Sequence, residues 1–471
     1  MTFPTSTPSA QGVEPAGIAA LVDALEAHPD IEPHGLIVQR HGRRIAEGYW
    51  APHTPDRSRL VYSLSKTFTG TALGLQLGEG RLSLDDPVEK HFPDLLADAD
   101  PRTRRMLVRH LASMATGHRS ETLLDAVLLD PDDVVGAFFR IAPDEEPGTV
   151  FAYNQPPVLA LATVLQRLAG ERLADYLRPR VLDPIGAGDL RCMEYQPGID
   201  VGFTGVYTSL DTVARLGQLY LDDGVWQGRR LLPEGWVTSA STPQVANPDE
   251  PTVDWQQGYG FQLWASTHGY RGDGAYGQLM VVLPEDDAVV GVYASTLLMQ
   301  DELDLVWAHL LPAMAATPLP AGDSDGRLAE QLATLALPTA AQRLGLDGTV
   351  APPPTAAPLT PVEVDWRSQR TVTAAEIDGD DLVLHEDVGT LHVPLRAAWT
   401  TGPVDHISAS AAVDAGGRVV ADLAFVETPH RLVVTLDPSG GTFTTTWASL
   451  PLTGIGVETY LATMHAPTDA A

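Results

Sequence analysis

The segment from residue 60 to residue 80 restricts the fold of this chain more than any other. It joins an apolar approach, a Ser63-x-x-Lys66 quartet and a run of apolar and small residues that ends at Gly78 or Gly80. If Ser63 opens a helix, Lys66 lies one turn later on the same face. A helix that is apolar on most faces is normally buried. The segment therefore predicts a buried helix with a hydroxyl and an amine side by side at its N-terminal end.

This pair has a chemical interpretation and a simpler structural one. A serine hydroxyl is a weak nucleophile until a base stands beside it, and a lysine is a base only when its surroundings lower its pKa. A helix start also directs free backbone N–H groups towards negative charge that forms there. Alternatively, Ser63 is an N-cap and Lys66 a solvated side chain, because Ser-x-x-Lys also occurs by chance. The expected burial of the helix favours the catalytic interpretation.

The composition excludes several classes of function. The chain has 471 residues, 44% of them hydrophobic, and a net charge of −31. It is long enough for two or three globular domains. An acid excess without a basic stripe argues against binding to nucleic acid or to an anionic membrane. Cys192 is the single cysteine, so no internal disulfide forms.

The N-terminal segment gives an expectation about location. Residues 1–14 are rich in Thr, Ser and Pro, and we expect a flexible tail. They lack the basic start and apolar centre of a signal peptide. No run approaches the roughly 18 apolar residues of a membrane helix. A cytoplasmic protein is therefore expected.

Residues 15–316 read as one α+β domain. A hairpin is expected over residues 34–49, followed by a long helical middle and a closing helix over 298–315. Three late segments read as consecutive strands of one antiparallel sheet: 258–264, 276–283 and 288–295. Terminal strands that enclose a helical insertion predict two lobes, with a site between them.

The composition changes after residue 316. Residues 317–360 contain many Pro and Gly residues and read as a linker with a candidate helix over 327–344. From residue 361 to residue 471, short apolar runs alternate with turn signals. This pattern predicts an antiparallel β domain, either a small barrel or a sandwich. We find no catalytic constellation and no metal-ligand set in it.

Acyl transfer requires a nucleophile, a base and a site for the oxyanion. Ser63 and Lys66 supply the first two. Tyr153 is a second candidate base, because it precedes a proline-led helix start and so lies in a loop of fixed shape. The segment from Gly272 to Gln278 is glycine-rich and would let a substrate lie along a strand edge. The alternatives are an ordinary packed tyrosine and an ordinary glycine-rich turn.

Taken in order, these motifs resemble the serine β-lactamase-related family, which includes class C β-lactamases, penicillin-recognising D,D-peptidases and esterases. The first motif is Tyr62-Ser63-Leu64-Ser65-Lys66-Thr67-Phe68. Further matching segments are 80–88, 108–117, 151–154, 217–220, 258–260 and 274–278. The resemblance runs from about residue 15 to 315. It implies a β-lactamase/transpeptidase-like fold, an antiparallel sheet with flanking helices and a helical lobe.

The resemblance also implies roles for individual residues. Ser63 would be the acylated nucleophile, Lys66 its base partner and Tyr153 a partner in proton transfer. The backbone N–H groups of Ser63 and Ala275 would form the oxyanion hole. No cofactor or metal is implied. The candidate substrate-binding residues are Asn154, Gln155, Asp273, Gly274 and Tyr276.

Two departures from the family pattern bear on the substrate. The second motif is normally Tyr-x-Asn, but here Asn154 follows Tyr153 directly and Gln155 takes the third place. The third motif normally carries a Lys or His, whereas here Asp273 stands between two glycines. That cation usually meets a substrate carboxylate, so its loss favours esters or neutral amides, although the adjacent Arg271 is able to reach the same space.

The expected function is therefore that of a serine hydrolase that acts on small esters, amides or peptides, with no nucleic-acid or membrane partner. The alternatives on the same fold are a β-lactamase, a D,D-carboxypeptidase, a D-peptide hydrolase and an acyltransferase. An alternative from another class is a binding protein that retains the fold without chemistry. The sequence does not indicate an oligomeric state.

Overall fold

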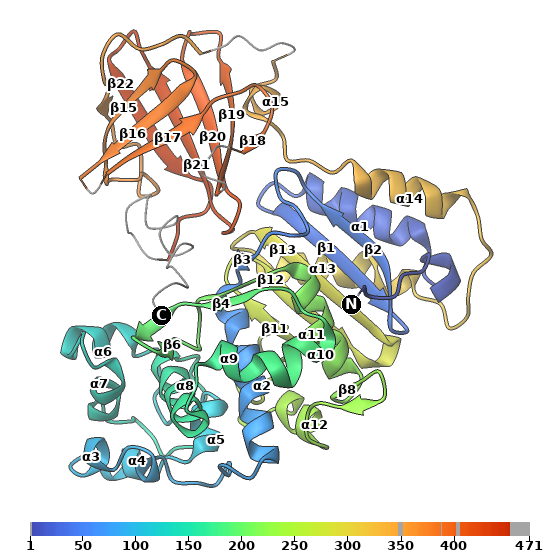
Figure 1. Cartoon of the computed structure of the whole chain (residues 1–471), viewed down its shortest axis with the longest axis vertical. Coiled ribbons are helices and arrows are strands. Elements are labelled where there is room, and N and C mark those ends of the chain that lie inside the picture. Colours follow the sequence, from blue (N-terminus) through green and yellow to red (C-terminus); the bar gives the residue numbers. More distant parts are fainter. Residues whose placement is uncertain (1, 347–351, 388, 402–405, 453–471) are drawn as a thin grey trace.

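The computed structural model describes residues 2–346, 352–387, 389–401 and 406–452. A mixed α/β body contains the N-terminal two thirds of the chain, and a β-rich part follows it (Figure 1). The predicted C-terminal domain extends to residue 471, and its last 19 residues, 453–471, lie outside the described ranges. The exact domain boundaries stay a prediction.

The body is built on one six-stranded antiparallel sheet. Its spatial order is β10 (Trp264–Ala265), β11 (Tyr270–Gly274), β12 (Gln278–Leu283), β13 (Ala288–Ser295), β1 (Glu32–Arg40) and β2 (Arg43–Tyr49). The strand β1 pairs with β13, with Val38 opposite Val290. The first hairpin of the chain therefore completes a sheet that is otherwise formed some 250 residues later. This arrangement confirms the expected α+β fold.

Helices cover both faces of this sheet, because its strands are apolar on both sides. Leu36 and Val38 face a core shared with α1 (Pro15–Ala27) and α13 (Met299–His309). Ile37 lies in the other core, which is shared with α11 (Leu210–Leu221) and with the helical lobe. Alternate residues of a strand point to opposite faces, so β1 contributes to both cores.

The helical lobe and the segments around it form the rest of the body. Its helices are α3 (Pro93–Leu96), α4 (Pro101–Arg104), α5 (Val108–Ala112), α6 (Leu123–Leu129), α7 (Val134–Arg140), α8 (Gln155–Ala169), α9 (Leu173–Leu177) and α10 (Asp183–Ile185). The short elements are β3 (Arg59–Leu60), β4 (Leu190–Cys192), β5 (Glu194–Gln196), β6 (Ile199–Asp200), β7 (Val206–Thr208), β8 (Val225–Trp226), β9 (Arg229–Arg230) and α12 (Trp236–Ser241).

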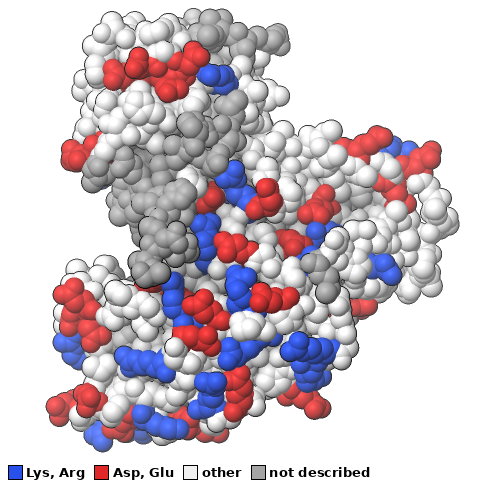
Figure 2. All heavy atoms as spheres, viewed as in Figure 1, with Lys and Arg blue, Asp and Glu red and all other residues white. Residues whose placement is uncertain are grey.

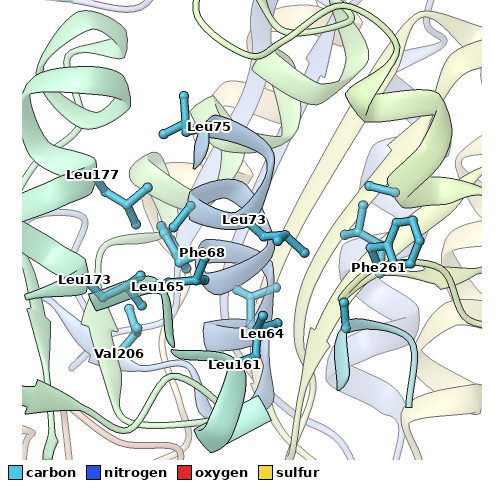
Figure 3. Packing of buried hydrophobic residues seen from close by; sticks show 14 of the residues in the cluster. Leu64, Phe68, Leu73, Leu75, Leu161, Leu165, Leu173, Leu177, Val206 and Phe261 are labelled. Carbon is cyan, nitrogen blue, oxygen red and sulfur yellow. The ribbon is translucent and has the colours of Figure 1, made fainter. Parts of the chain in front are cut away.

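The helix that carries Lys66 lies between the helical lobe and the sheet. It is α2 (Ser65–Gly78), and every residue from Ser65 to Gln76 is buried. Its side chains Phe68 and Leu73 pack among residues of α8, α9 and the loop at Phe261 (Figure 3). The α-helix begins at Ser65, and Ser63 lies in the 3₁₀ turn just before it, η2 (Tyr62–Leu64). The prediction of a buried helix is therefore correct, with its first turn tighter than expected.

The C-terminal part consists of two sheets around one core. The first has the order β14 (Thr360–Pro361), β22 (Thr442–Trp447), β21 (Arg431–Asp437), β20 (Val419–Phe425), β19 (Ile407–Val413) and β18 (Thr400–Thr401). The second consists of β15 (Val372–Asp378), β16 (Asp381–Glu386) and β17 (Gly389–Pro394). A single apolar cluster contains residues of both sheets, such as Leu384 and Val434.

Two local expectations differ from the structure. Residues 258–264 form a loop and not a strand, because Gly258 and Gln262 have positive φ values of 111° and 65°, which an extended strand excludes, and only Trp264 joins the sheet. The helix expected over 327–344 is two helices, α14 (Asp323–Ala333) and α15 (Ala340–Arg343). Pro338 separates them, since proline and the residue before it disfavour a continuous helix.

The N-terminal tail also differs from the expectation of a flexible segment. Phe3 is 6% exposed, and its ring centroid lies 6.0 Å from that of Trp226. The Arg44 amide donates to the Pro4 carbonyl oxygen at 2.8 Å. Val13 is fully buried in the core beside α1. The segment is therefore packed against the body by a few apolar side chains that its polar composition conceals.

Acidic and basic side chains alternate on the face of the body in Figure 2, without a continuous basic stripe on that face. Within the described ranges, no helix is both long and apolar enough to cross a membrane. The same residues contain no group of three or more His, Cys, Asp or Glu side chains arranged to hold a metal ion.

Candidate active site

Ser63 and Lys66 form the direct contact that the sequence predicted. The Lys66 Nζ donates to the Ser63 Oγ at 3.0 Å and to the Phe203 carbonyl oxygen at 2.9 Å. Lys66 is 1% exposed. Burial lowers the pKa of Lys66 to about 7, while Asp273 and Glu121 act in the opposite direction. Near neutral pH, a large fraction of this amine is therefore unprotonated and able to accept a proton.

Tyr153 completes a group of three polar side chains. It precedes α8, and a side-chain hydrogen bond links it to Ser63. Its ring stacks on Trp264 with centroids 5.3 Å apart, and the Lys66 Nζ lies 4.8 Å from the centroid of the Tyr153 ring. Burial raises the pKa of Tyr153 well above its usual range, and Asp273 adds to this effect. Tyr153 is therefore a neutral phenol that can donate or relay a proton.

The end of β11 lies against the turn that carries Ser63. A Cβ added to Gly274 would meet the Val61 carbonyl oxygen at 2.0 Å and the Leu64 nitrogen at 3.0 Å. A Cβ at Gly272 would meet the Thr67 Oγ1 at 2.2 Å. Only glycine allows this approach, and it brings Ala275, the next residue after β11, beside the nucleophile turn.

The third motif contains a buried ion pair between Arg271 and Asp273. The Arg271 Nε donates to an Asp273 carboxylate oxygen at 3.1 Å, and the two residues are 0% and 7% exposed. The Arg271 Nη1 also donates to the Ser266 Oγ at 2.6 Å and to two carbonyl oxygens. The Arg271 guanidinium lies 4.1 Å from the Trp255 ring centroid. Arg271 is therefore held by Asp273 and by neighbouring oxygens, while its Nη2 is buried without a hydrogen-bond partner among the described residues. The role of Arg271 in place of the missing cation stays a prediction.

The candidate substrate-binding residues lie in different environments. Asn154 is 1% exposed, and its Oδ1 accepts from the Thr122 amide and hydroxyl, both at 3.0 Å. The Gln155 amide donates to Glu121 at 3.2 Å. Tyr276 is 2% exposed, and its hydroxyl donates to the Leu450 carbonyl oxygen at 2.5 Å. Gln155, which is only partly buried, is thus the most accessible side chain of this set.

The sequence did not indicate some groups that hold the site together. The Phe203 carbonyl oxygen fixes Lys66, and Trp264 supports the ring of Tyr153. The Phe203 loop packs tightly, because a Cβ at Gly202 would meet the Ala162 Cβ at 2.4 Å. The glycine-rich stretch around Gly202 and Gly205 was a signal for this close approach, although nothing in it specified a lysine partner.

With this geometry in view, the family of the chain is clear. The profile of the β-lactamase family matches residues 18–312, well over half of the chain. The chain therefore belongs to the β-lactamase family.

The similar proteins extend the comparison. The chain is 28% identical over 306 residues to a 6-aminohexanoate-dimer hydrolase of Paenarthrobacter ureafaciens, covering 59% of this chain and 78% of that protein. A putative 6-aminohexanoate-dimer hydrolase from Bacillus anthracis has a similar fold, with a TM-score of 0.52, 18% identity, and coverage of 65% and 85% of the two chains. A structure of SurE with D-Leu matches 92% of this chain and 98% of its own, with a TM-score of 0.51 and 18% identity. The fold likeness therefore includes the C-terminal β-rich part.

Proposed function

We propose that this protein is a serine hydrolase that cleaves small amides or esters through an acyl-enzyme on Ser63. The observation that carries the proposal is the 3.0 Å contact between the Lys66 Nζ and the Ser63 Oγ, together with the burial that lowers the pKa of Lys66 to about 7. This arrangement supplies a nucleophile with a base, a large fraction of which is unprotonated near neutral pH.

The proposed reaction uses only groups of this chain and water. Lys66 accepts the Ser63 proton as the Ser63 Oγ attacks the substrate carbonyl. The backbone N–H groups of Ser63 and Ala275 bind the oxyanion. The proton passes through the neutral Tyr153 hydroxyl to the leaving nitrogen or oxygen, whose bond to the carbonyl carbon then breaks. In the second half, water attacks the acyl-enzyme carbonyl and gives its proton to the same bases. They return it to the Ser63 Oγ as the bond between this oxygen and the acyl carbon breaks.

The charge around the site supports uncharged or amine-bearing substrates. Asp273 faces Lys66 closely enough to affect its pKa, as does Glu121. Arg271 is already paired with Asp273. A substrate carboxylate near the third motif would therefore meet an arginine whose charge Asp273 already balances, in contrast to the family members that recognise penicillins. Neutral esters, and amides that place an amine rather than a carboxylate near the third motif, fit this environment better; the 6-aminohexanoate dimer satisfies this only with its amine end at that position.

The decisive experiment compares three substrate classes on the wild-type chain and on Ser63→Ala. The substrates are a p-nitrophenyl ester, the 6-aminohexanoate dimer and nitrocefin. We expect turnover of the ester or the amide to exceed that of nitrocefin, and Ser63→Ala to lower kcat by about three orders of magnitude or more. Unchanged turnover in Ser63→Ala would refute the proposal. Nitrocefin as the best substrate would favour a β-lactamase on the same fold.

Two remaining alternatives are separated by covalent trapping. A fluorophosphonate probe should add one adduct mass to the wild type, on the peptide that contains Ser63, and none to Ser63→Ala. A binding protein that retains only the fold would give no adduct in either chain. An acyltransferase would form the acyl-enzyme and release more product when an amine acceptor is added with the ester.

A further inference from the structure

Two tyrosines with unusual backbone conformations flank the proposed oxyanion hole. Tyr62 precedes Ser63 and has a φ of 47°, and Tyr276 follows Ala275 and has a φ of 67°. Bulky residues rarely adopt positive φ, and such conformations persist only where the surrounding structure fixes them. The rings of Tyr62 and Tyr276 lie 5.2 Å apart, so the residues beside the two amides share one small cluster.

The C-terminal β part holds both tyrosines. The Tyr62 hydroxyl lies 2.5 Å from the Nε2 of His430, in the turn between β20 and β21. The Tyr276 hydroxyl donates to the Leu450 carbonyl oxygen, which follows β22, at 2.5 Å. The His430 ring stands edge-on to both tyrosine rings, with centroids 5.9 Å from Tyr62 and 4.8 Å from Tyr276. These contacts join segments that are separated by more than 170 positions in sequence.

The environment of His430 defines the direction of its hydrogen bond. His430 is 2% exposed, and its Nδ1 lies 3.2 Å from the Ser449 carbonyl oxygen. A carbonyl only accepts, so Nδ1 carries the proton and Nε2 accepts from the Tyr62 hydroxyl. The same turn forms a backbone contact, in which the Leu60 amide donates to the Glu427 carbonyl oxygen at 2.9 Å. Hydrogen bonds from Leu60 and Tyr62, the residues on either side of Val61, thus attach the segment before Ser63 to the C-terminal part.

We infer that His430 is a positioning residue, through which the C-terminal β part fixes Tyr62 and Tyr276 and so aims the Ser63 and Ala275 amides at the substrate oxyanion. The inference rests on the proposed function and adds a task for the C-terminal part. His430 itself touches neither the nucleophile nor the base in the contacts described above. Its effect falls on kcat, since amides aimed at the oxyanion act on the transition state more than on the bound substrate.

The test compares His430→Leu with His430→Gln on the full chain, using the best of the three substrates. Leucine removes the acceptor for the Tyr62 hydroxyl, whereas the glutamine Oε1 replaces it near the position of Nε2. We expect His430→Leu to lower kcat at least tenfold with KM changed less than threefold, and His430→Gln to recover most of kcat. The inhibition constant of an arylboronic acid, whose tetrahedral adduct places an oxygen in the same hole, should rise in parallel with the loss in kcat.

Three measurements keep the result interpretable. Rates are divided by the active fraction, titrated with the fluorophosphonate probe. Val434→Ala, in the core of the C-terminal part, is a matched control that destabilises the same region without touching either tyrosine, and it should retain kcat. Tyr62→Phe removes only the hydroxyl and should lower kcat severalfold even if His430→Leu fails to fold.

Two outcomes would overturn the inference. One is an unchanged kcat in both His430→Leu and Tyr62→Phe. The other is a loss in Val434→Ala equal to that in His430→Leu, since activity would then follow stability alone. In both cases the proposed function would stand as long as Ser63→Ala is inactive, so the two failures are distinguishable.

Discussion

Lys66 shows how one residue can serve chemistry at the expense of stability. It lies in the first turn of α2 among buried side chains, with two hydrogen bonds, to Ser63 and to Phe203. An amine in this position is harder to protonate than in water, which is the property that a general base requires. The folded chain binds fewer protons at this position than the unfolded chain between about pH 7 and the ordinary lysine pKa, so stability rises with pH across that window. The stability cost of Lys66 is therefore largest at and below about pH 7.

The activity should therefore depend on pH in a defined direction. Below pH 7, Lys66 becomes protonated and cannot accept the Ser63 proton, so kcat/KM for a neutral ester should fall about tenfold per pH unit, with a midpoint near 7. The measurement is a kcat/KM profile from pH 5 to pH 9. A flat profile, or a midpoint near pH 5, would contradict the assignment of Lys66 as the base.

The variant Lys66→Met should separate stability from activity. It keeps the length of the side chain and removes the buried amine. We expect kcat to fall by several orders of magnitude, while the free energy of unfolding at pH 7 rises by about 1–4 kcal/mol. Urea unfolding at pH 7 and pH 9.5 measures the effect, and the gain should shrink at the higher pH. A variant that is less stable at both pH values would show that Lys66 contributes more by its contacts than it costs by desolvation.

At the scale of elements, the site depends on how closely β11 approaches the start of α2. The glycines of β11 leave room for the nucleophile turn, and no longer side chain fits between the two elements without displacement. The same approach places Ala275 beside Ser63. The geometry of the proposed oxyanion hole therefore depends on how closely the end of β11 packs against the 3₁₀ turn that carries Ser63.

Gly274→Ala tests this distance. The added Cβ would lie 2.0 Å from the Val61 carbonyl oxygen, so β11 must move away from the turn. A displacement of about 1 Å at a catalytic group costs on the order of 100-fold in rate. We expect a loss of this size in kcat. The control Gly326→Ala lies in α14 with no atom within 4 Å of the new Cβ, and it should keep full activity and gain up to about 1 kcal/mol of stability. Equal activity in both variants would contradict the role of the close approach.

At the scale of the whole molecule, an ion cluster joins the hydrolase body to the C-terminal part. Glu32 on β1 accepts from Arg431 on β21 at 2.9 Å and from Arg343 at 3.2 Å. Asp422 lies on the other side of both arginines. Burial alone would raise the pKa of Glu32, but Arg431, with His34 and Arg343, holds this pKa well below its usual range. The carboxylate therefore stabilises the folded chain above its unfolded pKa, and the contribution is lost as the pH falls towards its folded pKa.

Glu32→Gln should weaken the junction between the two parts. We expect a loss of about 1–3 kcal/mol at pH 7, because the arginines retain Asp422 as a partner. The stability difference between Glu32→Gln and the wild type should shrink at pH 3. In calorimetry at pH 7, the unfolding transitions of the body and the C-terminal part should lie further apart in the variant than in the wild type. The control Glu363→Gln removes an exposed partner of Arg370, and it should change stability by less than about 0.5 kcal/mol. A Glu32→Gln effect no larger than this control would show that the cluster does not join the two parts.

The sequence was sufficient to predict an element where the local residue pattern is compatible with only one kind of secondary structure. The buried helix after Ser63 followed from its apolar residues, and the hairpin over residues 34–49 from its turn and alternation. The order of motifs identified the fold and placed Ser63, Lys66 and Tyr153 as one group. It could not identify residues 258–264 as a loop, because their aromatic alternation is typical of a strand, and the positive φ of Gly258 and Gln262 that prevents one is visible only in the structure.

Tertiary structure decided which residues from distant segments of the chain contact one another. The chemistry of Ser63 and Lys66 was determined by the sequence, since their spacing puts both on one turn of a helix. The burial that lowers the Lys66 pKa, the Arg271–Asp273 pair and the His430 contact to Tyr62 depend on elements far apart along the chain. Such contacts form only when elements from distant segments pack together, and the residue pattern within one segment does not indicate which other segment it will contact. The sequence therefore predicted the nucleophile and its base, and the fold decided the electrostatics of the candidate site and the part of the chain that holds it.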